Sequence, residues 1–293
     1  MIAAIVQARL GSTRLPGKTL ADIAGRPMLA WLVERARRIP GVERVIVATT
    51  EKPADQAILR FAADHGLPAY AGSEEDVLDR FYQTARRHGV AVVVRVTPDC
   101  PLLDPAVSGA VLARFLEGRG AIDYASNTQP PTFPDGLDTE AFSFDALARA
   151  WRETAEPSDR EHVTPYLWKQ PGAFRVANVT HEPNLSALRW TVDTAADLEF
   201  VRAVYARLGA SAEAAGMDDV LDLLRRHPEL AALNRGIARN EGYATSVRAA
   251  RAYTGREMIA CCGYHGWQDW YIGTTTRRRG VPAAVRALTH TFA

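Results

Sequence analysis

Short runs of apolar and β-branched residues alternate along this chain with segments in which apolar residues recur at every third or fourth position. The runs have the length of buried strands, and the segments between them have the spacing of helices that face a core. The strand-like runs lie at 2–6, 44–48, 91–96, 122–125, 174–179 and 188–192. The helical segments lie at 28–39, 54–65, 74–88, 105–117, 144–154 and 195–208. This alternation is typical of βαβ units, so the sequence predicts an α/β protein with a mostly parallel sheet.

Two segments depart from the alternation. Residues 126–138 form a polar loop that contains proline and asparagine, and residues 157–171 have helical spacing but many polar side chains. Long loops in such folds often carry binding residues. Beyond residue 217 the pattern predicts two short helices separated at His227, and it stops before Tyr243. We therefore expect one domain over residues 1–243 and a short C-terminal extension over residues 244–293.

The composition is that of a folded globular protein. The chain has 293 residues, of which 47% are apolar and 24% charged, and this length suffices for a sizeable core. No apolar run approaches the ~18 residues of a membrane span, and Arg9 follows the first run too closely for a signal peptide. The three cysteines, Cys100, Cys261 and Cys262, show no paired pattern. These features predict a cytoplasmic protein that has no disulfides and no membrane contact.

Charge is distributed unevenly along the chain. The formal net charge is +1, but residues 244–293 hold seven arginines against two acidic residues, which gives +5 and leaves −4 for residues 1–243. The arginine run at 277–279 is short, and a chain this close to neutrality is not expected to bind nucleic acid. The only lysines are Lys18, Lys52 and Lys169. Chemistry that needs an amine therefore has three candidates.

A loop rich in cations follows the first predicted strand. Residues 7–19 contain Arg9, Arg14 and Lys18 together with Gly11 and Gly17. Because α/β sheets bind ligands at the carboxyl ends of their strands, this loop predicts a polyphosphate site. The Gly-Lys-Thr at 17–19 is also compared with a P-loop, but a serine stands at position 12, where that motif needs glycine. A solvated basic turn is the second alternative.

Residues 7–18 are the first of several segments that resemble one family, the spore-coat-polysaccharide type cytidylyltransferases, relatives of the acylneuraminate and 3-deoxy-manno-octulosonate cytidylyltransferases. The resemblance continues at 72–80, 99–102, 123–127, 134–138, 160–166, 189–194 and 240–243. It implies a Rossmann-like nucleotidyltransferase fold. The activity it implies joins a hydroxyl of a sugar acid or related sugar to the α-phosphate of CTP, with release of pyrophosphate, in surface polysaccharide or glycoconjugate biosynthesis. The nucleotide-binding residues it implies are Ala8, Arg9, Gly11, Ser12, Arg14, Lys18, Ser73 and Arg80.

Two aspartates end predicted strands beside this loop. Asp99 follows the run at 91–96 and Asp193 follows the run at 188–192. Two carboxylates at such a place suit Mg²⁺, although Asp193 could instead cap the next helix and Asp99 could stabilise a turn. The resemblance implies that both bind the metal and act in catalysis together with Arg14 and Lys18. Pro98 departs from the family, which usually has glycine before the first aspartate.

A polyhydroxylated substrate needs polar side chains, and those of the two irregular segments are the candidates. Each could equally be solvated or stabilise its loop. The resemblance places this region at the sugar site and at a homodimer contact. The predicted substrate-binding residues are Asn127, Asp135, Glu140, Arg160 and His162.

The extension resembles a second family. Residues 247–256 and 263–267 are similar to part of a class III, glutamate-semialdehyde type aminotransferase, in which the residue at Tyr264 would stack on pyridoxal phosphate. Pyridoxal enzymes need a lysine, and the chain has none after Lys169. We therefore expect either a piece of a fused aminotransferase or a remnant that serves as a packing or assembly surface.

Taken together, the residues and the resemblance predict a Mg²⁺-dependent sugar cytidylyltransferase. Its partners would be CTP, a small sugar and a second copy of the chain. Two alternatives stay open from the sequence. One is a nucleotidyltransferase that uses another nucleoside triphosphate, and the other is a non-catalytic assembly subunit that keeps the fold. The sequence identifies neither the sugar nor a general base.

Overall fold

The structure, a computed structural model, describes residues 1–118, 120–170, 172–237, 239, 259–261 and 289–291, the last two segments by their backbone alone. The chain separates into two compact units, Met1–Arg235 and Gly236–Ala293. In the second unit, strands β10 (Ile259–Cys261) and β11 (Thr289–Thr291) pair in parallel. The boundary expected at Tyr243, the aminotransferase-like Tyr264 and the arginines at 277–279 lie outside the described residues and stay predictions.

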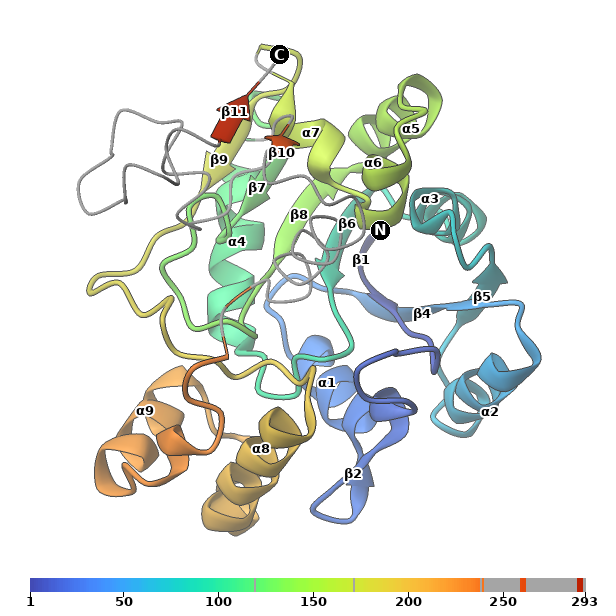
Figure 1. Cartoon of the computed structure of the whole chain (residues 1–293). Helices are drawn as coiled ribbons and strands as arrows, with labels where there is room; N and C mark the ends of the chain where they lie inside the picture. Colours follow the sequence, from blue (N-terminus) through green and yellow to red (C-terminus); the bar gives the residue numbers. More distant parts are fainter. Residues whose placement is uncertain (119, 171, 238, 240–258, 262–288, 292–293) are drawn as a thin grey trace. The chain divides into compact units, whose positions relative to one another are not determined.

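The first unit is built on a seven-stranded mixed sheet in the order β5-β4-β1-β6-β8-β7-β9 (Figure 1). Four of its six strand pairs are parallel: β5·β4, β4·β1, β1·β6 and β7·β9. Strand β8 is antiparallel to both of its neighbours, β6 and β7. The predicted α/β fold with a mostly parallel sheet is confirmed. The strands are β1 (Ile2–Gln7), β4 (Arg44–Thr50), β5 (Ala69–Gly72), β6 (Val92–Val96), β7 (Tyr124–Ser126), β8 (Glu140–Ser143) and β9 (Val176–Asn178).

Helices cover both faces of this sheet, because successive side chains of a buried strand point to opposite faces. In β1, Ala4 and Val6 pack with α1 (Met28–Arg37), α2 (Gln56–Asp64) and α4 (Pro105–Glu117), whereas Ala3 and Ile5 pack with the opposite layer. That layer consists of α3 (Val77–Arg87), α5 (Phe144–Glu153) and α7 (Pro165–Lys169), with α6 (Pro157–His162) beside α3.

A third apolar cluster joins the end of the unit to the outer side of α1. Met28 and Trp31 of α1 pack there with Trp190 and with helices α8 (Ala195–Leu208) and α9 (Met217–Arg226), which lie side by side in Figure 1. The short elements of the unit are the hairpin β2 (Asp22–Ile23) and β3 (Arg26–Pro27), and the 3-10 helices η1 (Lys18–Leu20), η2 (Pro53–Asp55), η3 (Gly209–Glu213) and η4 (Leu230–Ala232).

One carboxylate caps two helices of this unit. Asp104 precedes α4 and accepts the N–H groups of Ala106 and Val107 at 2.6 and 3.1 Å. Its second oxygen accepts the N–H of Met217, the first residue of α9, at 2.6 Å. Helix N-termini have N–H groups without partners inside the helix, and Asp104 accepts two of them at α4 and one at α9. It thereby ties the layer of α4 to the third cluster.

The predicted strand at 188–192 is wrong. The segment makes a single bridge, from Arg189 to Asp135, and its apolar residues Trp190 and Val192 are buried in the third cluster instead of the sheet. Gly136 permits this contact, because at φ +112° its Cα lies against the backbone of residues 190 and 191, where a Cβ would come within 2.8 Å. Strands β5 and β8 were not predicted; both have four residues and lack a long apolar run.

The polar helical segment expected at 157–171 is two short helices instead of one. Val163 interrupts it with φ +74° and ψ −57°, which is rare and strained for a β-branched residue. The N–H of Thr164 donates to the carbonyl of His162 across this turn at 2.9 Å. Val163 is fully buried, so the packing of its side chain holds the strained turn in place.

Candidate active site

The predicted phosphate loop lies at the edge where the parallel strands β1, β4, β5 and β6 end, and contacts across that edge hold its shape. The N–H of Leu10 donates to the carboxylate of Asp55 at 2.7 Å, and the hydroxyl of Thr19 donates to the carbonyl of Arg9 at 2.7 Å. Gly17, with φ +74°, starts the three-residue helix η1. A P-loop leads directly into a long helix, so the P-loop alternative does not describe this loop.

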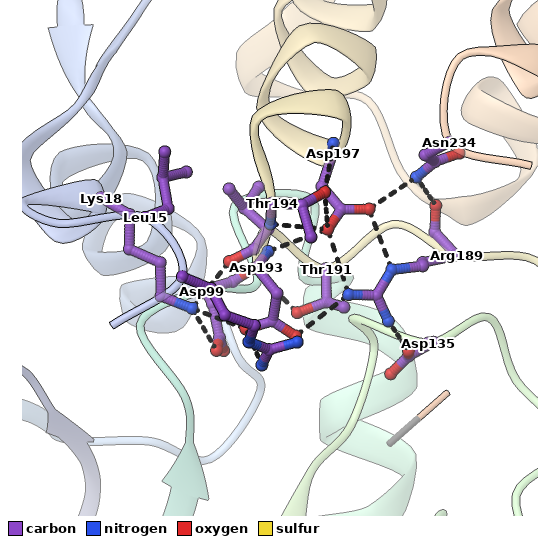
Figure 2. A network of polar contacts seen from close by, with 12 residues as sticks. Leu15, Lys18, Asp99, Asp135, Arg189, Thr191, Asp193, Thr194, Asp197 and Asn234 are labelled. Carbon is purple, nitrogen blue, oxygen red and sulfur yellow. Dashed lines mark hydrogen bonds and ion pairs between the residues drawn. The ribbon is translucent and has the colours of Figure 1, made fainter. Parts of the chain in front are cut away.

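Lys18 connects the two predicted metal ligands. Its ammonium donates to Asp99 Oδ2 at 3.0 Å, to Asp193 Oδ1 at 2.8 Å and to the carbonyl of Val192 at 2.7 Å, as Figure 2 shows for the carboxylates. Asp99 lies in the turn after β6, and Asp193 lies just before α8. The structure therefore brings these three residues together, as the sequence predicted, and their roles stay predictions.

The charges in this group stabilise one another. Burial opposes ionisation of Asp99, but the Lys18 ammonium and the Thr97 hydroxyl hold the pKa of Asp99 below its ordinary value. Burial likewise opposes the charge on Lys18, but Asp99 and Asp193 raise the pKa of Lys18 above its ordinary value. The lysine is therefore a fixed cation and the aspartate a fixed anion near neutral pH. Because the N–H of Val192 donates to the carbonyl of Asp99 at 2.8 Å, the backbone also joins the two segments.

The two loop arginines are open to solvent. Arg14 contacts Asp193 Oδ1 at 3.0 Å with 43% of its side chain exposed, and Arg9 lies 3.7 Å from Glu74 with 45% exposed. Glu74 also pairs with Lys52. Exposed guanidinium groups beside a glycine-containing loop suit the oxygens of a polyphosphate, and they equally fit the alternative of a solvated basic turn.

The other predicted nucleotide-binding residues lie in this loop or at the segment that enters α3. Ala8 is buried and extends the pairing of β1 through its N–H, which donates to Ala48 at 2.9 Å. Ser12 accepts the N–H of Leu15 at 3.3 Å. Arg80 is 1% exposed and donates to the carbonyl of Ser73 at 2.6 Å, while its Nε finds no partner within the described part of the chain. Burial and the nearby Arg9 lower the pKa of Arg80 to about 10.

Arg189 holds the far side of Asp193 (Figure 2). Its guanidinium contacts Asp193 Oδ2 at 3.0 Å, Asp135 Oδ2 at 3.0 Å and Asp197 at 2.9 and 3.1 Å. Burial alone would lower the pKa of Arg189, but Asp197 and Asp135 raise it above its ordinary value. Burial would likewise raise the pKa of Asp197, and Arg189 holds it below its ordinary value. Neither Arg189 nor Asp197 was assigned a role from the sequence.

The alternative that Asp193 caps the next helix is wrong, because Asp193 does not cap α8. The N-cap is Thr194, whose hydroxyl accepts the N–H of Asp197 at 3.2 Å, while Asp197 accepts the N–H groups of Thr194 and Asp193 at 2.9 and 3.0 Å. This reciprocal pattern is a capping box, and its signature, a threonine followed three residues later by an acidic residue, is visible in the sequence. The carboxylate of Asp193 is consequently left to Lys18, Arg14 and Arg189.

The predicted sugar-side residues do not gather at one point. Asn127 is buried and spends its amide on the backbone of Leu137 and Thr139, at 2.8 and 2.9 Å, so it shapes the loop that carries Asp135. Glu140 accepts hydroxyls of Tyr124 and Thr164 at 2.5 and 2.6 Å and pairs with Arg95. Asp135 alone joins the Asp193 group directly.

Arg160 and His162 lie on α6. Arg160 contacts Asp76 at 2.6 Å and donates to the carbonyls of Trp151 and Thr154 at 3.1 and 3.0 Å. His162 is exposed at the end of the helix, next to the strained turn. These contacts give Arg160 a clear structural role, since they join α6 to the start of α3. Substrate contact by either residue stays a prediction.

The chain matches the sequence model of the family described as "Cytidylyltransferase" over residues 3–208. It belongs to the cytidylyltransferase family. The spore coat polysaccharide biosynthesis protein SpsF of Bacillus subtilis is 30% identical over 234 residues, which cover 78% of this chain and 95% of that protein. The 3-deoxy-manno-octulosonate cytidylyltransferase of Geobacter sulfurreducens is 39% identical over 116 residues, 40% of this chain and 46% of the relative.

A solved structure confirms the fold of this cytidylyltransferase. The cytidylyltransferase of Leptospira borgpetersenii superposes with a TM-score of 0.76 and 28% identity, over 81% of this chain and 99% of that one. The sequence prediction of a SpsF-like enzyme with a nucleotidyltransferase fold is thus confirmed.

Within the described part of the chain, no helix is long and apolar enough to span a membrane.

Proposed function

We propose that this cytidylyltransferase uses Mg²⁺ to transfer CMP from CTP to a hydroxyl of a sugar acid or related sugar, with release of pyrophosphate. The observation that carries the proposal is the Lys18 ammonium held between Asp99 and Asp193 at the end of the phosphate loop. The names of the SpsF and 3-deoxy-manno-octulosonate relatives support a sugar substrate in polysaccharide synthesis. We infer a sugar acid or related sugar as the acceptor from these names and from the polar side chains of the loop at 126–138.

The residues present fit a magnesium ion. Oxygens of Asp99 and Asp193 already converge on one cation, Lys18 Nζ, at 3.0 and 2.8 Å. No group of three or more acidic, histidine or cysteine ligands occurs within the described residues, and Mg²⁺ typically takes only one or two protein carboxylates, with phosphate and water oxygens as the rest.

The chain's own cations serve the triphosphate in this proposal. Bound Mg²⁺ would orient the phosphate oxygens and stabilise the charge that develops on the leaving pyrophosphate. Arg9 and Arg14, both half exposed, would bind the phosphates that leave as pyrophosphate, and Lys18 would supply a compact positive charge beside them. The sugar hydroxyl loses its proton and forms the new bond to the α-phosphorus as the bond to pyrophosphate breaks.

Pyrophosphate release tests the proposal. The full chain is incubated with Mg²⁺, each of CTP, UTP, ATP and GTP, and a panel of 3-deoxy-ulosonic and nonulosonic acids. We expect release with CTP and one class of acceptor. Release with another triphosphate only would favour the alternative nucleotidyltransferase, and no release with any pair would favour a non-catalytic assembly subunit.

Variants of the two aspartates test the site itself. Asp99→Asn and Asp193→Asn should each lower Mg²⁺-dependent turnover by roughly 100-fold or more, because an amide replaces a charged ligand oxygen. The matched control is Asp123→Asn, which makes the same change at a carboxylate paired with Arg175 outside this group. Near-unchanged turnover in both site variants would refute the assignment.

A homodimer and a cytoplasmic setting belong to the same proposal. The family resemblance of the polar segments at 126–138 and 157–171 motivates the dimer, and the three cysteines, which show no paired pattern, motivate a reducing compartment. Light scattering coupled to size exclusion decides the first point: a mass near 64 kDa, twice the 32.1 kDa chain, is expected, and a monomer mass would contradict it.

A further inference from the structure

Asn234 lies beyond the segment that the family model matches, yet it reaches into the group around Asp193. The residue follows η4 and is 6% exposed. Its amide nitrogen donates to the carbonyl of Arg189 and to Asp197 Oδ1, both at 3.0 Å (Figure 2). Both donors of the amide are thus spent on the two residues that surround Asp193. A buried polar group with all its donors used in this way is costly to remove.

Asp197 transmits this contact to the backbone of Asp193. Its side chain is fully buried, and its Oδ2 accepts the N–H of Asp193 at 3.0 Å. Asn234 and Arg189 Nε both donate to the other oxygen, Oδ1. With both oxygens occupied, the carboxylate of Asp197 cannot rotate, so the segment entering α8 has one position.

Arg189 transmits the same contact to the side chain of Asp193. Its carbonyl is held by Asn234, and its guanidinium fixes Asp193 Oδ2 at 3.0 Å. The other oxygen, Oδ1, is the one that contacts Lys18. Asp193 therefore presents one oxygen to the candidate metal site because the other is held from behind.

We propose that Asn234 is a positioning residue for the metal-binding carboxylate of Asp193, acting through Arg189 and Asp197. The proposal rests on the proposed function, because it assumes that Asp193 binds the metal. Partners that orient metal ligands typically affect affinity by about 10–100-fold. The functional unit then extends through residue 234, past the segment that the family model matches.

The test uses Mn²⁺ as a spectroscopic probe on the full chain, with CTP present and no acceptor, so that no turnover is needed. CTP alone also binds Mn²⁺, so free Mn²⁺ is measured by electron paramagnetic resonance with and without the protein at the same CTP concentration, and the difference gives the dissociation constant of the protein-bound ion. Asn234→Ala should raise that constant by about 10-fold. Asn234→Ser, which keeps a small polar side chain and adds no charge beside Asp197, should also raise it and keeps the result interpretable if the alanine variant folds poorly.

Asn178 provides the matched control. Its side chain also makes several hydrogen bonds, to Gln129, Pro130 and Ser126 at 3.0 to 3.3 Å, but contacts no residue around Asp193. Asn178→Ala and Asn178→Ser should lower stability without changing the Mn²⁺ constant, and CTP binding without metal should be equal in all variants. An unchanged Mn²⁺ constant in both Asn234 variants would overturn this inference alone. Absence of Mn²⁺ binding in the unaltered protein would overturn the proposed metal site and this inference with it.

Discussion

Replacing Arg189 by methionine should destabilise the first unit strongly. The substitution keeps an unbranched apolar stem of similar reach and removes the guanidinium that contacts Asp135, Asp193 and Asp197. Three carboxylates would then lose their shared cation. The effect is greatest for Asp197, which is fully buried and cannot gain water in exchange, whereas the side chains of Asp135 and Asp193 are 11% and 19% exposed.

The magnitude follows from that burial. Removing one partner of a buried ion pair costs about 3–5 kcal/mol, because the remaining charge stays desolvated. Single domains unfold with about 5–15 kcal/mol in total, so this loss is a large fraction of the stability. Adding Asp197→Asn to Arg189→Met should recover at least about 1 kcal/mol, since the side chain left without its partner is then uncharged.

Urea unfolding followed by circular dichroism measures these free energies. The matched control is Arg175→Met, which removes the same group from an exposed pair with Asp123, where solvent screens the charges and little change is expected. A loss below about 1 kcal/mol for Arg189→Met, or a double variant no more stable than the single one, would refute the view that Arg189 neutralises a buried carboxylate.

Three further changes have defined outcomes. Lys18→Ala should weaken CTP binding in calorimetry by roughly 10-fold or more, and Lys18→Arg should restore it only in part, because a planar guanidinium does not reproduce the compact ammonium whose three donors meet Asp99, Asp193 and the carbonyl of Val192; unchanged affinity would contradict the phosphate role. Asp104→Ala should cost about 2–3 kcal/mol in urea unfolding, since α4 and α9 both lose an N-terminal acceptor, and a loss below half of this would show that one cap suffices. Ending the chain after Tyr243, which keeps Asn234, should leave pyrophosphate release within about 2-fold; loss of turnover in a folded truncated protein would show that the extension completes the site.

Much of the sheet could be predicted from the sequence alone. The apolar runs that became β1, β4 and β6 are short, β-branched and followed by helical spacing, and this local pattern already decides which residues face the two helical layers. The position of Lys18 and Asp99 just beyond strand ends had the same origin, because parallel strands bring their carboxyl ends to one edge. The sequence therefore determined the two helical layers of the sheet, the sheet edge at which ligands are expected to bind, and the residues that follow the strands at that edge.

Only the tertiary structure decided which segments pair and which polar groups meet. The run at 188–192 has the composition of a strand, yet it packs in the third cluster and is not part of the sheet. Strand β8, which has no long apolar run, lies in the sheet between β6 and β7 and is antiparallel to both. Periodicity tells whether a segment is buried, but its partner is chosen by packing against residues far away in the chain. The same holds for Arg189, whose partners Asp135 and Asn234 stand 54 and 45 positions away. A buried charge takes whichever acceptors the fold brings to it, and no local pattern records that choice.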